Sequence, residues 1–109
     1  MFVEEHLLPF TYFYSMKLNS FLQTLDANTP PVELSDYLQS LWWDKKGDWG
    51  KSHEIIQDLG DKNAAWIHAY LHRKEGDIWN ADYWYTRAGK TRPQCTLEEE
   101  WTLITEAML

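Results

Sequence analysis

Two stretches of this chain, Ser40–Ser52 (SLWWDKKGDWGKS) and Ala69–Ala81 (AYLHRKEGDIWNA), are versions of one another. They align without gaps at a shift of 29 residues, the difference between Gly76 and Gly47. Both place a small residue, an apolar pair, a lysine, Gly-Asp, an apolar residue and a second small residue in the same order. Repeats of 20–50 residues are typical of stacked supersecondary units that bury their apolar faces against each other. The repeat therefore predicts an architecture that is mostly used as a binding scaffold.

Length and composition limit the class of protein. A chain of 109 residues predicts one domain with one modest core. The net charge of −7 argues against binding to nucleic acid, because phosphates are neutralised by clustered Lys and Arg. The apolar runs are too short to cross a membrane, so we expect no membrane contact. Cys95 is the single cysteine and cannot form an internal disulfide, which favours a reducing, cytoplasmic location.

Helical spacing of apolar residues runs along the chain, and no segment alternates as a strand does. Gly47 and Gly76 are each followed by an aspartate, a pattern that ends one helix and caps the next. The segment from Thr96 to Glu99 has the capping-box pattern of a further helix start. These signals predict an all-α fold of five or six helices, at about residues 16–26, 32–46, 48–59, 62–75, 77–88 and 96–109.

The domain organisation predicted from this pattern is a single helical unit over residues 16–109 with an extension before it. Residues 1–15 differ in composition from the rest of the chain, and we expect them to be a poorly ordered or added extension. The unit divides into repeat 1 at about 34–60, repeat 2 at about 63–93 and a capping helix at 96–109.

The repeat resembles the tetratricopeptide family. In each copy two small residues lie twelve positions apart, and a bulky apolar residue follows four later: Ser40, Ser52 and Ile56 in the first, Ala69, Ala81 and Tyr85 in the second. Residues 65–89, with Gly-Asp and then Ala-x-x-Trp-Tyr-x-x-Ala, are similar to the related Sel1 repeat. Residues 69–77 are also similar to a family of small uncharacterised bacterial proteins. The resemblance implies two antiparallel helix hairpins between an N-terminal helix and a capping helix.

The resemblance also implies an inner face on the first helix of each hairpin. There an aromatic floor with basic ends is suited to an extended peptide and its carboxylate. The residues predicted to bind a partner in this way are Tyr37, Leu41, Trp66, Tyr70, Arg73 and Lys74. The alternative is that these aromatic side chains are buried against the first and last helices.

The aromatic excess suggests a second surface. Neighbouring residues on a helix point about 100° apart, so two adjacent tryptophans cannot both face one core. Exposed aromatic patches mark interfaces, and a short repeat stack gains by pairing. We therefore expect a possible homodimer that uses Trp42, Trp43, Trp79 and Trp84. Alternatively, the same residues line different seams within one monomer.

A third constellation is histidine-rich. His68 and His72 are four residues apart and share a helix face, the geometry that metal sites use, and His53 is a further candidate. No His-Glu-x-x-His motif and no cysteine pair accompanies them. The alternative is that His72 packs between helices and that His68 is a polar surface or edge residue.

Catalytic patterns are weak in this sequence. Glu98–Glu100 is an acidic run that suits a helix start, and no phosphate loop or nucleophile elbow is found. The sequence predicts no catalytic residue and no cofactor, and it leans away from an enzyme while leaving one open. The function it favours is a protein-interaction or scaffold module. The alternative is a small-molecule or metal-binding protein that uses His53, His68 and His72.

Overall fold

The structure, a computed structural model, describes the backbone of residues 10–109 and the side chains of residues 17–109. Within residues 10–109 the chain is helical and has no strand, which confirms the all-α prediction. Its elements are α1 (Phe10–Gln23), the short 3-10 helix η2 (Thr24–Asp26), α2 (Asp36–Lys45), α3 (Trp49–Ile56), α4 (Lys62–Lys74), α5 (Ile78–Arg87) and α6 (Leu97–Met108). None of these helices is both long and apolar enough to cross a membrane.

The turns inside the two copies have the predicted chemistry. Gly47 and Gly76 adopt φ angles of 93° and 86°, a left-handed conformation that favours glycine. The carboxylates of Asp48 and Asp77 then accept the backbone N–H three residues on, which caps α3 and α5. At α6 the capping box is complete: the Thr96 hydroxyl accepts from the backbone N–H of Glu99, and the Glu99 carboxylate accepts from that of Thr96.

Two helix starts differ from the prediction. The first helix begins at Phe10, six residues before the expected Met16. Of the extension predicted over residues 1–15, residues 1–9 lie outside the described residues. The helix expected from Val32 begins four residues later, at Asp36, because the side chain of Ser35 accepts the backbone N–H of Leu38 and caps the helix there.

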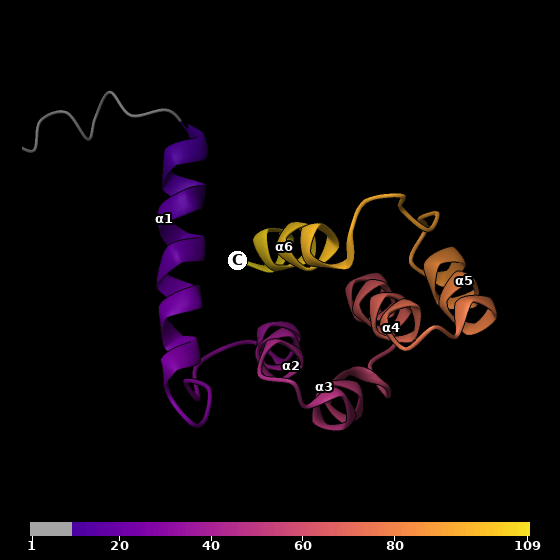
Figure 1. The fold of residues 1–109 in the computed structure, drawn as a ribbon, viewed down its shortest axis with the longest axis horizontal. Coiled ribbons are helices and arrows are strands. Elements are labelled where there is room, and N and C mark those ends of the chain that lie inside the picture. The colour runs from indigo at the N-terminus through magenta and orange to yellow at the C-terminus, as the bar shows by residue number, and fades with distance from the viewer. Residues whose placement is uncertain (1–9) are drawn as a thin grey trace, which may run out of the picture.

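The helices pack in sequence and then close on themselves (Figure 1). Helix α2 packs on α3 and α4 packs on α5, while α3 contacts α4. Helix α6 returns across the molecule to α2 and α4 and reaches α1, so it fills the space beside the first helix of each copy. The main core comprises Phe21, Leu38, Leu41, Trp42, Ile56, Ala64, Ile67, Tyr70, Leu71, Trp101 and Ile104.

The small residues of the repeat lie where paired helices approach most closely. Ser40 and Ser52 are fully buried, and the Ser40 hydroxyl lies 2.8 Å from the backbone oxygen of Ser52. In the second copy Ala69 and Ala81 are fully buried in a cluster with Tyr85. A larger side chain at any of these four positions would push two helices apart, which explains why both copies keep small residues there.

Candidate metal centre

The face predicted to bind a partner is largely covered by α6. Leu41 is fully buried and Tyr70 nearly so, because both belong to the core that α2, α4 and α6 share. The Tyr70 hydroxyl donates to the buried Asp44 carboxylate at 2.9 Å. In this fold Leu41 and Tyr70, two of the residues predicted to bind a partner, are therefore core residues. Tyr37 is half-buried, and its hydroxyl donates to Asp61 at 2.6 Å.

The basic residues predicted to hold a partner's carboxylate hold carboxylates of this chain. Arg73 Nη1 lies 2.8 Å from Glu100 Oε1, and the guanidinium also donates to the backbone oxygen of Cys95. Lys74 Nζ lies 2.9 Å from Asp44 Oδ1. Arg73 thus ties α4 to α6, and Lys74 ties α4 to α2 while remaining exposed.

Glu100 is a structurally important buried residue that was not predicted from the sequence. Its side chain is 1% exposed, although the acidic run Glu98–Glu100 is typical of a solvated helix start. Besides Arg73, its carboxylate accepts from the Tyr85 hydroxyl at 2.7 Å and from Trp66 Nε1 at 3.3 Å. Its position four residues before Ile104, on the apolar face of α6, is the signal that could have revealed it.

The four tryptophans predicted to self-associate lie in different environments. Trp42 is fully buried, and its indole N–H donates to Thr24 Oγ1 at 3.1 Å, so it lies in the core of this fold. Trp43 is half-buried beside Trp42, and Trp84 is half-buried against His68. Trp79 is 81% exposed and is the one of the four that is largely accessible.

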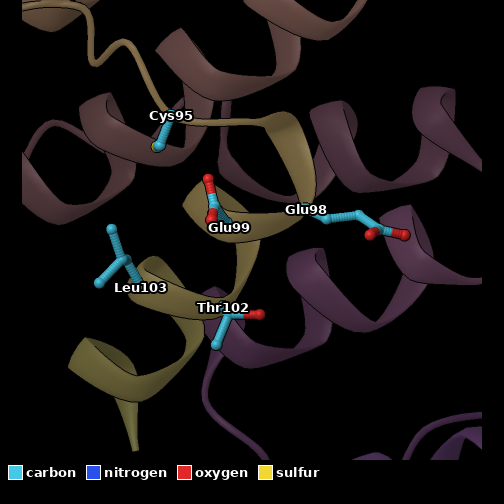
Figure 2. Close-up of a pocket in the computed structure, with 5 residues that line it drawn as sticks. All are labelled: Cys95, Glu98, Glu99, Thr102 and Leu103. Atoms are coloured by element: carbon cyan, nitrogen blue, oxygen red, sulfur yellow. The ribbon is translucent and has the colours of Figure 1, made fainter.

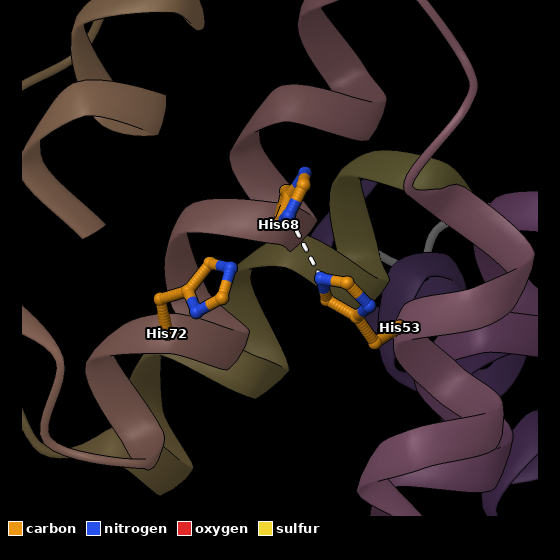
Figure 3. A group of neighbouring side chains, drawn as sticks. All are labelled: His53, His68 and His72. Carbon is orange, nitrogen blue, oxygen red and sulfur yellow. Dashed lines mark hydrogen bonds between the residues drawn. The ribbon is translucent and has the colours of Figure 1, made fainter. Parts of the chain in front are cut away.

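The histidines do come together. His53 on α3 and His68 and His72 on α4 each offer a ring nitrogen, and the three nitrogens lie within 4.8 Å of one another. Figure 3 shows the three rings facing a common space, with the Nε2 atoms of His53 and His68 joined by a 2.9 Å hydrogen bond. His68 and His72 are 6% and 7% exposed, so His72 packs between helices as the alternative has it, whereas His68 does not lie at the surface. The i, i+4 spacing on α4 is visible in the sequence, whereas the approach of His53 depends on how α3 packs on α4.

Aromatic side chains from both copies enclose this histidine cluster. The Trp49 ring stacks on His53 at a centroid distance of 4.8 Å, and the Trp84 ring stacks on His68 at 3.9 Å. The Trp49 indole N–H is fixed by the backbone oxygen of Leu71 at 2.8 Å. The cluster therefore has rigid apolar walls, which limit the freedom of the imidazole rings.

The electrostatics favour the neutral forms of His53 and His68. Burial lowers the pKa of His68 to about 3, and the neighbouring rings of His53 and His72 add to this effect. Burial likewise lowers the pKa of His53 below its ordinary value, with His72 adding to the effect and Glu75 opposing it. At neutral pH both imidazoles are therefore neutral, which is the state in which histidine binds metals.

Glu75 determines how His72 can act. Its Oε1 atom lies 2.6 Å from Nδ1 of His72. A carboxylate only accepts hydrogen bonds, so Nδ1 of His72 carries a proton, and in the neutral form of the ring the lone pair is then on Nε2. Glu75 and Asp77 also form a group with His72 that could hold an ion, but the Asp77 carboxylate already caps α5. The carboxylate of Glu75 is thus placed as the hydrogen-bonding partner of a ligand histidine.

A separate hollow lies on the outer side of α6 (Figure 2). It is about 590 Å³ in volume and is lined by Cys95, Glu98, Glu99, Thr102 and Leu103. Glu99 is engaged in the capping box, and Leu103 is exposed. The lining contains no histidine and no cation, so this hollow adds no group to the cluster.

The fold and the site define an all-α protein in which α3 and α4 bring together three histidines, two of them buried. No family model, no curated protein and no solved structure matches the chain.

Proposed function

We propose that this chain binds one divalent transition-metal ion of the zinc class through His53, His68 and His72. The observation that supports this function best is the convergence of three imidazole nitrogens within 4.8 Å of one another. Imidazole is a ligand for zinc, copper, nickel and cobalt, whereas magnesium and calcium prefer oxygen ligands. The ligand set therefore selects the class of ion.

The distances in the cluster suit such an ion with small ring movements. Zinc–nitrogen bonds of about 2.0–2.1 Å in a tetrahedral site place two ligand nitrogens about 3.3 Å apart. The separation of 2.9 Å between His53 and His68 is slightly shorter than this, and the upper limit of 4.8 Å within the cluster is longer. One of these two Nε2 atoms carries the proton of the hydrogen bond, so binding requires that ring to take the tautomer with the proton on Nδ1, and two bonds to the ion then replace the hydrogen bond.

Three protein ligands leave one position of a tetrahedral ion for water or for a small ligand. His53 is the least buried of the three histidines and marks the side from which solvent reaches the cluster. Because His53 lies on α3 and the other two ligands lie on α4, the ion would also join the two copies of the repeat. An ion that binds the folded chain and not the unfolded chain raises the free energy of unfolding.

A protein-interaction module is the second candidate function, and the strongly exposed Trp79 favours it. Arg73 and Lys74 do not support a peptide groove on the inner face, because Glu100 and Asp44 already pair with them. An interaction through this chain therefore needs another surface than the face that α6 covers.

The metal proposal is tested by titrating the chelator-treated full chain with Zn²⁺ in a calorimeter and with Co²⁺ in a spectrophotometer. We expect one ion per chain and the strong visible absorption of tetrahedral Co²⁺. His53→Gln is the first ligand variant, because His53 is only partly buried and its loss disturbs the core least. Glu54→Gln changes the exposed neighbouring residue and serves as the matched control.

The expected result is tight binding by the wild type and by Glu54→Gln, with a large loss of affinity in His53→Gln. Absence of binding by a folded wild-type chain would overturn the proposal. Equal affinity in His53→Gln would also overturn it, because the ion would then be held elsewhere.

A further inference from the structure

The outer face of α5 is an aromatic surface that no described helix covers. Trp79 is 81% exposed and Tyr83 is 47% exposed, and both project from the same side of the helix because they are four residues apart. Arg87 follows four residues later, and its Nη1 atom donates to the Tyr83 hydroxyl at 3.1 Å. Trp79, Tyr83 and Arg87 are named the α5 stripe. In a repeat array the outer face of the last hairpin is where a further helix would stack.

The charges along α5 are unequal at its two ends. Glu75 and Asp77 precede the helix and are exposed, whereas Arg87 and Lys90 lie at or beyond its C-terminal end. Asp82, within the helix, pairs with Arg92 at 2.8 Å and is balanced by it. The acidic end meets the positive end of the helix dipole, and the basic end meets the negative one. Helix α5 therefore has an acidic N-terminal end, a basic C-terminal end and exposed aromatic side chains between them.

Two copies of such a helix are complementary to each other when they lie antiparallel. A two-fold axis that passes near Tyr83 brings the tyrosines of two copies together and places Trp79 of each copy beside Arg87 of the other. The acidic end of each helix then faces the basic end of its partner. Arginine on the face of tryptophan is a favourable cation–π arrangement, and pairing of the same surface on both subunits is the rule for two-fold dimers.

We infer that the α5 stripe is a self-association surface whose partner is a second copy of this chain in antiparallel orientation. The inference does not depend on metal binding, because the stripe contains none of the three histidines. Of the four tryptophans expected to self-associate, the proposed surface includes only Trp79. The other three are buried or half-buried within the monomer.

The size of the stripe sets the strength of the dimer. A helix of ten residues is about 15 Å long, so two such faces bury less than the roughly 1,200 Å² of a stable standard interface. The dimer therefore belongs to the weak, reversible class, and its formation depends on concentration. The net charge of −7 on each copy favours association at moderate rather than very low ionic strength, since salt screens the overall repulsion.

The test is sedimentation velocity of the full chain, in chelator, from about 10 µM to about 1 mM, a range that covers weak affinities. Trp79→Lys places a cation opposite Arg87 of the second copy, and Arg87→Glu removes the cation from the face of Trp79. Each variant alone should therefore remain monomeric at concentrations where the wild type pairs. In an equimolar mixture the introduced lysine faces the introduced glutamate, and the native Trp79–Arg87 contact is kept on the other side of the axis.

Association is expected to return in the mixture, which a structural effect of either substitution alone would not produce. Val32→Ser is the matched control, because Val32 is 91% exposed and does not belong to the stripe. It should sediment as the wild type does. A wild type that stays monomeric to about 1 mM would overturn the inference. So would variants that pair normally, or a mixture of folded variants that stays monomeric.

Discussion

Replacing Glu100 with alanine is expected to be one of the most damaging single changes to this fold. Glu100 is 1% exposed and is the shared acceptor for Arg73, Tyr85 and Trp66. The substitution leaves a largely buried guanidinium without its carboxylate and a buried tyrosine hydroxyl without its acceptor. Removing one partner of a buried ion pair costs about 3–5 kcal/mol. A domain of this size is stabilised by only about 5–15 kcal/mol, so a large part of the folding free energy is lost.

The assay is urea unfolding followed by tryptophan fluorescence and by circular dichroism. Glu98→Ala removes an exposed carboxylate from the same run, and its effect should stay within about 0.5 kcal/mol. Glu100→Gln keeps an acceptor for Tyr85 but loses the charge that faces Arg73, and we expect an intermediate loss of about 1.5–3 kcal/mol. A Glu100→Ala variant as stable as Glu98→Ala would refute the reasoning, because α6 would then not depend on its buried carboxylate.

Two further predictions concern the histidine cluster. The metal-free chain should lose stability as the pH falls below 6.5, because the unfolded chain then protonates His68 whereas the folded chain does so only near a pKa of about 3. The loss from this group is at most about 1.4 kcal/mol per pH unit, and urea unfolding should show a smaller slope between pH 6.5 and 5 in His68→Gln. An unchanged slope in that variant would contradict the assignment. Glu75→Gln should weaken Zn²⁺ binding about 10–100-fold, because the carboxylate that orients the His72 ring through Nδ1 is lost. Glu75→Asp keeps a carboxylate and should recover part of the affinity in the same titration. Equal affinity in wild type and Glu75→Gln would show that His72 does not depend on Glu75.

The local part of this fold could be predicted from the sequence because its signals are local. The left-handed Gly47 and Gly76 lie next to the aspartates that cap the following helices, and the capping box of α6 spans four residues. These features need only neighbouring residues, so their chemistry can be read from spacing. The predicted start of α2 is too early because the apolar pattern continues through Leu34, whereas the capping side chain is Ser35.

The parts that escaped prediction depend on contacts between distant residues. Glu100 and Arg73 are 27 residues apart, and nothing in the acidic run indicates that its third member turns inward to meet an arginine of α4. The docking of α6 also covers Leu41 and Tyr70 on the face predicted to bind a peptide. The histidine cluster is half predictable: the spacing of His68 and His72 defines one helix face, but the position of His53 follows from the packing of α3 on α4.

The position of the cluster within the repeat gives a physical reason for its composition. In the alignment of the two copies, His68 corresponds to Gln39 and His72 to Trp43. In the first copy no earlier repeat lies beside these positions. The Gln39 side chain instead donates hydrogen bonds to the backbone oxygens of Pro31 and Leu34, in the segment before α2.

In the second copy the same positions face α3, the last helix of the first copy, and His53 meets them there. In repeat stacks generally, neighbouring units are coupled through the interface between them. Neutral imidazoles stacked on Trp49 and Trp84 hold the interface in the absence of an ion, and an ion bound to all three would hold it more tightly. The proposed metal binding would therefore be coupled to the packing of α3 on α4 through the same three side chains.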